Sequence, residues 1–358
     1  MDIPEGEYAL PTAYLNTAAH GLIPARAVAA LHEAVADTHE GRVDVSRYLE
    51  AMHAARASYA RLLGLPPGRV AVGSSVSVHT AVIAASLPPG SEVLHAVDEF
   101  SSAVTPYATR PGLRTRAVPL PELAASVGPD TALVAVSAAQ SLDGRVADLP
   151  ALRAAASRHG ARLMVDLTQA AGWLAEPAAH ADFTVCAAYK WLLCPRGTAF
   201  LTMPEDFGGL QPVHAGWPAG EDMWRSSYGT VTEFAAGARR FDESPAFLAW
   251  VGAERALGLV EELGTAAIAA HDLALARRFR EGLAALGAEA VPAESPIVAV
   301  PGLGGAAEEL ERAGVQASVR GPNLRLSFHV YNTAEHVDRA LTALAGALPR
   351  PGRGAARA

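Results

Sequence analysis

Lys190 is the only lysine in this chain of 358 residues, in which lysine and arginine together number 29. An arginine can replace a lysine in most ion pairs, but its guanidinium keeps its proton near neutral pH. A desolvated lysine amine can lose that proton and form a Schiff base with a carbonyl group. The alternative is a lysine that remains by chance in an arginine-rich composition. The sequence thus marks Lys190 as a candidate nucleophile.

Polar residues also follow several apolar segments that we predict to be strands. Asp98 follows segment 92–97, Ser137 follows segment 132–136, and Asp166 closes segment 162–166. Strands that alternate with helices predict a mainly parallel sheet, which binds ligands beyond the carboxyl ends of its strands. An aspartate in such a position can also be a simple turn residue. Chemistry at these positions is therefore one of two open interpretations.

A third polar group lies at Gly73-Ser74-Ser75, between a predicted strand at 69–72 and a helix that extends to Leu87. Serine hydroxyls and backbone N–H groups at a helix N-terminus form an anion site. Serine is also a favoured capping residue, so this pattern alone leaves both interpretations open.

Taken together, these groups match the needs of pyridoxal 5′-phosphate (PLP). Its aldehyde requires a lysine, its pyridine nitrogen a carboxylate such as Asp166, and its phosphate N–H and hydroxyl donors. An amino-acid substrate requires an arginine, whose planar fork matches a carboxylate, and Arg325 lies in the otherwise apolar segment 324–330. An aromatic side chain such as Phe100 could stack on the cofactor ring.

The elements that must hold these residues form one large and one smaller α/β part, since a single core rarely grows beyond about 250–300 residues. We predict a PLP-binding domain at 14–260, to whose site the N-terminal segment contributes, a small domain at 261–348 and a disordered tail at 349–358. Residues 204–245 show little periodicity and are predicted as loops. The predicted helices span residues 25–39, 48–63, 149–159, 245–263 and 265–286.

Composition narrows the classes of partner. The net charge of −8 and the lack of a basic cluster give no reason to expect nucleic acid or an anionic membrane surface. The two cysteines, Cys186 and Cys194, flank Lys190 and are predicted to be buried apolar residues without a disulfide or a metal. No signal peptide or membrane-spanning run is recognisable, so we expect a cytoplasmic protein.

The sequence also resembles a known family over residues 14–348, the class V group of fold-type I PLP-dependent aminotransferases. Relatives in that group include cysteine desulfurases, kynureninases, isopenicillin-N epimerase-like enzymes and C–S lyases. The aspartate–glutamine pair followed by the lysine is the most specific mark. The motifs that carry the resemblance are Tyr14-Leu15-Asn16-Thr17-Ala18-Ala19, Gly73-Ser74-Ser75, Val165-Asp166-Leu167-Thr168-Gln169, Tyr189-Lys190-Trp191, Pro195-Arg196-Gly197, Arg239-Arg240-Phe241-Asp242, Leu324-Arg325-Leu326-Ser327 and Tyr331-Asn332-Thr333.

The resemblance implies an α/β fold with a large, mainly parallel seven-stranded sheet and a role for each matching residue. Lys190 would form the Schiff base and act as the general base. Asp166 would hold the pyridine N–H, and Gln169 would bond the cofactor's phenolic oxygen. The remaining implied contacts are Ser74 and Ser75 to the phosphate, Phe100 to the ring, and Arg325 to the substrate carboxylate.

Some positions depart from the family pattern. The residue before the lysine is commonly a phosphate-binding histidine, and here it is Tyr189, which could donate through its hydroxyl. A serine often found three residues before the lysine is Ala187 here. In relatives a Gly-Thr pair reaches the neighbouring subunit's phosphate, for which Ser244 is the candidate in this chain. That contact would make the active unit a homodimer with the site near its interface.

The reaction type is less defined than the cofactor. Desulfurases of the family use a cysteine in the C-terminal part, and this chain has none after Cys194. Desulfuration through a persulfide is therefore not expected. Transamination of an amino acid is the preferred prediction because it is the default outcome of a lysine, PLP and aspartate set, with C–S β-elimination and epimerisation as alternatives. His20 and Gln140 are candidate substrate-binding residues, whereas Trp191, Trp217 and Trp224 fit a core or interface better.

Two other classes of protein would show different sequence features. A dinucleotide-binding protein would carry Gly-x-Gly-x-x-Gly at the first strand–helix turn, and the chain lacks it. A non-catalytic relative would have lost Lys190 or Asp166, and both are present.

Overall fold

The computed structural model describes residues 1, 3–176 and 178–348, so the tail predicted at 349–358 lies outside the described residues. The chain forms two compact units. Among the described residues, the larger unit comprises 21–140 and 147–265, and the smaller comprises 1–20, 141–146 and 266–348. The larger unit has one seven-stranded sheet, the smaller unit has a three-stranded sheet and a two-stranded sheet, and each unit has its own apolar core.

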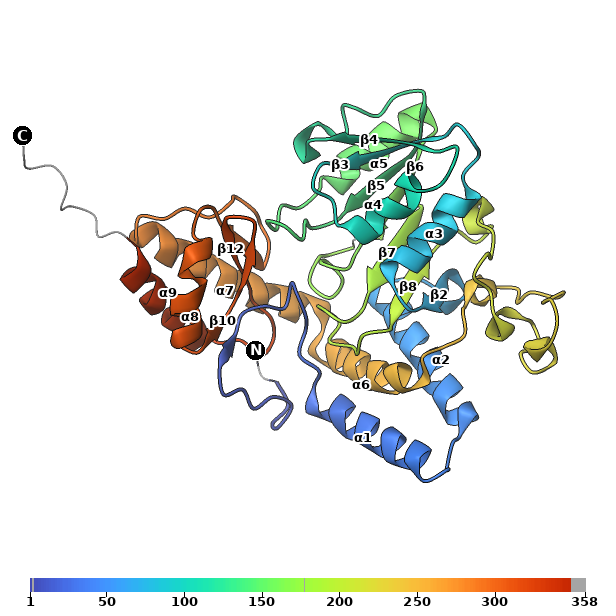
Figure 1. Ribbon diagram of the computed structural model, residues 1–358, viewed down its shortest axis with the longest axis horizontal. Helices are drawn as coiled ribbons and strands as arrows, with labels where there is room; N and C mark the ends of the chain where they lie inside the picture. The colour runs from blue at the N-terminus through green and yellow to red at the C-terminus, as the bar shows by residue number, and fades with distance from the viewer. Residues whose placement is uncertain (2, 177, 349–358) are drawn as a thin grey trace, which may run out of the picture. The chain divides into compact units, whose positions relative to one another are not determined.

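A seven-stranded sheet forms the centre of the larger unit (Figure 1), in the order β2-β8-β7-β6-β5-β3-β4. Neighbouring strands are parallel except at β8, which is antiparallel to both β2 and β7. The predicted α/β fold with a mainly parallel sheet is confirmed. The strands are β2 (Val70–Gly73), β3 (Glu92–Ala96), β4 (Arg114–Val118), β5 (Thr131–Ser137), β6 (Arg162–Asp166), β7 (Phe183–Ala187) and β8 (Ala199–Thr202).

Helices surround this sheet, and the starts of α2, α3 and α5 carry side-chain caps. Asp44 and Asp148 accept backbone N–H groups at the first turns of α2 and α5, as N-cap aspartates do. In Figure 1, α1 and α2 lie beside α6, and both pack against it. The helices are α1 (Ala25–His39), α2 (Val45–Leu62), α3 (Val76–Ser86), α4 (Ser101–Ala108), α5 (Leu149–His159) and α6 (Phe247–Leu263).

Two elements of the larger unit were not predicted. Helix α4 contains Pro106, which has no N–H for a helical bond and hides the helical pattern in the sequence. Strand β4 lies at the edge of the sheet, and its Arg114 and Thr115 are exposed, so it lacks the apolar run of a central strand. Residues 204–245 contain only short 3-10 turns, in agreement with the predicted loops.

The smaller unit includes the first twenty residues, whereas the prediction placed residues 14–20 in the larger domain. Strand β1 (Ala13–Tyr14) pairs with β10 (Val315–Gln316), and Asn16 bridges to Ser327. These pairings tie the start of the chain to its C-terminal part. The predicted division at 260/261 itself remains a proposal. The other elements are α7 (Thr265–Ala285), β9 (Ile297–Val300), α8 (Ala307–Arg312), β11 (Ser318–Arg320), β12 (Asn323–Ser327) and α9 (Ala334–Ala347).

Both cysteines are buried and unbridged, as predicted from the sequence. Burial raises the pKa of the Cys186 thiol well above its usual value. Among the described residues, no helix has the length and apolar character needed to cross a membrane.

Candidate active site

Lys190 lies in a tight turn that follows β7, and its side chain is almost completely buried, with 3% exposure. Gly21 packs directly on this turn, since its N–H donates to the Tyr189 carbonyl at 2.9 Å. A Cβ at Gly21 would lie 1.9 Å from the Lys190 carbonyl oxygen, so only glycine fits there. Leu193 closes the turn with a φ of 58°, a costly conformation for a buried leucine. The backbone around Lys190 is thus held closely from both sides.

Asp166 ends β6, directly opposite Ser137 of β5 in the sheet register. One of its carboxylate oxygens accepts the Thr168 N–H at 2.8 Å. Burial raises the pKa of Asp166 to about 6; the bonds from Thr168 oppose this shift, Glu99 adds to it, and Lys190 lowers it. A buried carboxyl group with this pKa is suited to bind a ligand that donates an N–H to it.

Phe100 follows β3 after a sharp turn in which Asp98 has a φ of 63°. The Lys190 Nζ lies 5.1 Å from the centre of the Phe100 ring. Phe100 is 43% exposed. The structure therefore brings together Lys190 and Phe100, which are far apart in the sequence.

Gln169 lies in the loop after β6 and is buried. Its side-chain oxygen accepts the Trp191 indole N–H at 2.8 Å, and its backbone carbonyl accepts the Trp173 indole N–H at 2.7 Å. The Gln169 Nε2 is then the atom of this amide that could donate to a phenolic oxygen. Trp191 is 1% exposed, as expected for a core residue.

The turn before α3 binds an internal anion. The Ser74 N–H donates to the Glu243 carboxylate, and Ser75 caps the helix by accepting the Val78 N–H at 3.4 Å. Ser75 is thus a capping residue, one of the two interpretations left open by the sequence, and phosphate binding at this turn stays a prediction. A carboxylate in this position stands in for the phosphate that such a turn could bind.

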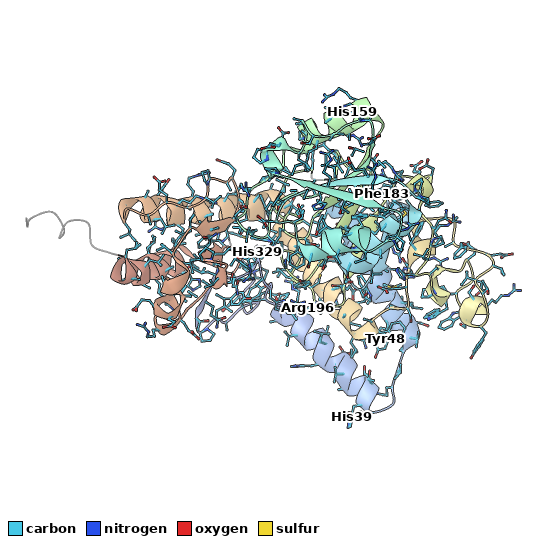
Figure 2. The ribbon with its side chains drawn as sticks, turned by 45° about the horizontal axis from the view of Figure 1, so that its top comes forward. His39, Tyr48, His159, Phe183, Arg196 and His329 are labelled. Carbon is cyan, nitrogen blue, oxygen red and sulfur yellow. The ribbon has the colours of Figure 1, made fainter. Side chains whose placement is uncertain are left out.

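Tyr189 and Ser244 belong to the same unit as Lys190. The Arg196 guanidinium, labelled in Figure 2, lies 3.9 Å from the centre of the Tyr189 ring. Segment 242–244 is anchored beside β2, because Asp242 forms a buried ion pair with Arg56 and accepts the Val72 N–H. Whether Ser244 reaches a partner's phosphate stays a prediction.

Arg325 and His20 belong to the smaller unit. Arg325 is 1% exposed, its Nη1 bonds the Ser141 carbonyl, and its Nε donates to the Ser318 hydroxyl at 3.2 Å. Its buried Nη2 has no hydrogen-bond partner among the described residues. Burial lowers the pKa of Arg325. Tyr14 donates its hydroxyl to the His20 carbonyl at 2.7 Å, which holds the backbone of the segment that contains His20.

Gln140, predicted to bind substrate, donates its side-chain amide to Glu99 at 2.6 Å. Glu99 and Gly21 were missed by the sequence reasoning. The only local signal for Glu99 is that it stands immediately before Phe100, and Gly21 stands in a turn-rich segment that gives no hint of its contact with Lys190.

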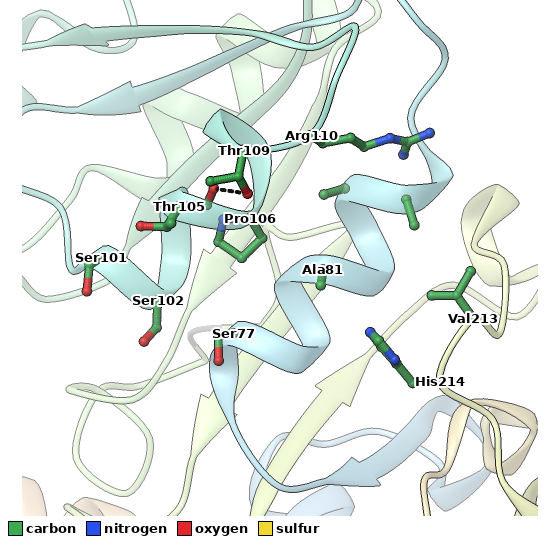
Figure 3. Close-up of a pocket in the computed structure, with 12 residues that line it drawn as sticks. Ser77, Ala81, Ser101, Ser102, Thr105, Pro106, Thr109, Arg110, Val213 and His214 are labelled. Carbon is green, nitrogen blue, oxygen red and sulfur yellow. Dashed lines mark hydrogen bonds between the residues drawn. The ribbon is translucent and has the colours of Figure 1, made fainter.

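A separate cavity of about 620 Å³ lies between α3 and α4 (Figure 3). Ser77 and Ala81 line it from α3, and Ser102 and Thr105 line it from α4. Lys190 and Asp166 are not among the described residues that line this cavity. It carries no part of the candidate site.

Residues 13–340 match the family Aminotransferase class-V. The chain belongs to this family. It is 32% identical over 343 residues to isopenicillin N epimerase from Streptomyces clavuligerus, covering 82% of this chain and 84% of the relative. It is also 26% identical to the uncharacterized aminotransferase YcbU from Bacillus subtilis (strain 168), covering 83% and 84% of the two chains.

Solved structures share the fold of this class-V chain. The cystine C-S lyase C-DES in complex with cysteine persulfide matches with a TM-score of 0.83 and 22% identity, covering 94% of this chain and 97% of that one. The apo cysteine desulfurase from Thermococcus onnurineus NA1 matches with a TM-score of 0.82 and 23% identity, covering 97% and 98%. At these identities the likeness shows the fold alone.

Membership of the class-V family makes this chain a PLP-dependent enzyme. The described residues fit that cofactor. A buried lysine, a buried carboxyl group with a raised pKa and a helix start that already holds an anion are the three kinds of group that PLP needs.

Proposed function

We propose that this enzyme is an amino-acid aminotransferase in which Lys190 moves the proton at the substrate's α-carbon. The observation that carries the proposal is the single lysine of the chain, buried and 5.1 Å from the ring of Phe100. Bound PLP supplies an electron sink that stabilises negative charge at that carbon. The neutral Lys190 amine then acts as the base.

Other residues would hold the cofactor. Asp166 would accept the pyridine N–H, and Gln169 would donate through Nε2 to the phenolic oxygen. The α3 start, with Ser74 and Ser75, would bind the phosphate, helped by the hydroxyls of Tyr189 and of a partner's Ser244. The buried position of Asp166 and the anion already held at Ser74 support these roles.

Phe100 favours transamination over epimerisation. Inversion of the α-carbon requires that a proton reach the face opposite the base. The residue expected on that face is Phe100, whose side chain has no exchangeable proton. Removal and return of a proton by Lys190 on one face suffices for transamination.

Arg325 would bind the substrate carboxylate. Its guanidinium is buried, and its Nη2 has no partner among the described residues, so an incoming carboxylate would satisfy a costly orphan donor. His20 and Gln140 remain candidates for contacts to the rest of the substrate. We also propose a small-molecule substrate, a homodimer and a cytoplasmic location.

A second candidate is amino-acid epimerisation. It is supported by two relatives named isopenicillin N epimerase, which are 32% and 29% identical to this chain. C–S β-elimination has weaker support, because the lyase structure that matches is only 22% identical.

A panel of amino acids separates these reactions. We expect a keto acid that forms only when an amino acceptor is present, and exchange of the α-proton with deuterated solvent without inversion. Formation of the D-isomer without an acceptor would instead establish epimerisation, and release of ammonia with pyruvate would establish elimination. Either result would refute the aminotransferase proposal.

Lys190→Arg tests the role of the lysine. The variant keeps the positive charge but cannot form the Schiff base, so we expect turnover to fall at least about 1,000-fold. Borohydride treatment should attach the cofactor to Lys190 of the wild type and leave the variant unmodified in peptide mass spectra. Retained turnover in the variant would contradict the proposal.

A further inference from the structure

The Glu99 carboxylate accepts four hydrogen bonds. Its Oε1 accepts the Ser137 N–H at 2.8 Å and the Gln140 side-chain amide at 2.6 Å. Its Oε2 accepts the Ser137 hydroxyl at 2.5 Å and the Phe100 N–H at 3.2 Å. Hydrogen bonds to an ionised carboxylate are short and strong, so this group of contacts, the Glu99 clamp, is a rigid point. With both oxygens bonded, Glu99 is not placed to act as an acid or base.

The clamp joins two strand ends of the sheet. Glu99 leaves β3 just before Phe100, and Ser137 ends the neighbouring parallel strand β5. Ser137 is directly opposite Asp166 on the next strand, β6. Glu99 thereby connects Phe100, beside Lys190, to Ser137 at the end of β5, the strand that pairs with the one carrying Asp166.

Phe100 depends on such an anchor. Its ring is 43% exposed, so packing alone does not hold its direction. The preceding Asp98 has a left-handed backbone, and Phe100 occupies the N-cap position of α4 without a side-chain cap. The backbone turn at 98–100 therefore sets where the ring points, and the Glu99 clamp sets that turn.

We propose that Glu99 is a positioning residue that holds Phe100 over the cofactor ring by fixing the turn to Ser137 and Gln140. The inference rests on the proposed stacking of Phe100 on PLP. It goes beyond the proposed function because Glu99 has no part in that function. It also gives Gln140 a function, as a donor to Glu99. The ligand concerned is the planar, aromatic pyridine ring of PLP.

Glu99→Ala removes all four bonds and should weaken PLP binding about 10- to 100-fold, measured by absorbance titration of cofactor-free protein. It should also reduce the visible circular dichroism of the bound cofactor, which reports how the ring is held. Glu99→Gln should retain only part of the PLP affinity and of the circular dichroism signal. Whichever oxygen becomes an NH₂ group, it faces a backbone N–H, of Ser137 or of Phe100.

A double-mutant cycle with Phe100→Ala tests the route of the effect. If Glu99 acts through Phe100, then Glu99→Ala should weaken PLP binding less than about 3-fold in the Phe100→Ala background. If the double variant loses PLP affinity by the product of the two single-variant factors, the inference is refuted. Unchanged circular dichroism in Glu99→Ala would refute it as well.

Controls separate positioning from general damage. Glu122→Ala removes an exposed glutamate and should leave PLP affinity and circular dichroism unchanged. If Glu99→Ala does not fold, Gln140→Leu removes one donor of the clamp and enters the same cycle. A wild type that binds no PLP at Lys190 would overturn the proposed function. A wild type that binds PLP but gives an additive cycle would overturn only this inference.

Discussion

At the scale of single residues, Asp166 is a carboxyl group whose ionisation the fold opposes. Burial raises its pKa from 3.8 to about 6. Between pH 3.8 and about 6, the folded protein therefore holds a proton on Asp166 that the unfolded chain has released. This contribution to stability is present below pH ~4 and is lost as the pH rises through about 6. At neutral pH the buried charge then costs on the order of 3 kcal/mol.

Asp166→Asn should therefore stabilise the cofactor-free protein at pH 7.5 and have little effect at pH 4. Urea unfolding of both proteins at the two pH values measures the difference. With PLP bound, the wild type should be the more stable of the two proteins at pH 7.5, because asparagine cannot pair with the protonated pyridine nitrogen. Equal stabilities of the cofactor-free proteins at pH 7.5 would contradict the argument.

Glu243 places a negative charge at the turn proposed to bind phosphate. Glu243→Gln keeps an oxygen for the Ser74 N–H and removes the charge, which should raise PLP affinity about 3- to 10-fold. Pyridoxal, which lacks the phosphate, should bind both proteins equally in the same titration. The exposed Glu205→Gln serves as the matched control. Weaker PLP binding by Glu243→Gln would show that Glu243 supports the site instead.

At the scale of elements, the site depends on how closely loops approach the ends of β6 and β7. Gly21 shows this most directly, since its Cα faces the Lys190 carbonyl without room for a methyl group. The contact is between backbones, so neither partner can move aside by changing a rotamer.

Gly21→Ala should push the Lys190 turn away, weaken PLP binding more than about 10-fold and lower the melting temperature by several degrees. Gly258→Ala is the matched control, because Gly258 lies in α6 with nothing within 4 Å of its added Cβ. That change should raise stability by about 0.5–1 kcal/mol. An alanine at Gly21 without loss of cofactor would refute the role of this contact.

At the scale of the whole molecule, segment 204–245 exposes aromatic side chains that suit an interface. Tyr228 is 93% exposed and Trp224 is 58% exposed, and Trp224 stacks on Trp217 with ring centres 5.5 Å apart. Large exposed aromatic groups are enriched where protein surfaces associate. They support the proposed homodimer.

Light scattering should give twice the chain mass of 37.1 kDa for the wild type. The double change Trp224→Ser with Tyr228→Ser should shift the protein toward monomer at micromolar concentration. Val35→Ser removes an exposed apolar group from α1 and should leave the mass unchanged. A monomeric wild type, or a variant that stays dimeric, would contradict this surface as the interface.

Local sequence determined the elements that have continuous patterns. The limits of α1 and α5 were predicted as the structure has them, because their apolar spacing and flanking turn residues act within a few positions. The proposal that Lys190 is the reactive group also rests on the sequence, since it is the only lysine. Arg114 in an edge strand and Pro106 in a helix obscured two further elements.

Tertiary structure alone decided which of these groups meet. The Glu99 clamp joins residues 38 to 41 positions apart, Gly21 reaches the turn of Lys190, and the first strand pairs with β10. Such contacts depend on the order of strands in the sheet and on loop paths, neither of which has a local pattern. The sequence by itself therefore determined the cofactor class, PLP, because that depends on residue types, whereas the fold decided which residues lie together, because that depends on contacts between distant segments.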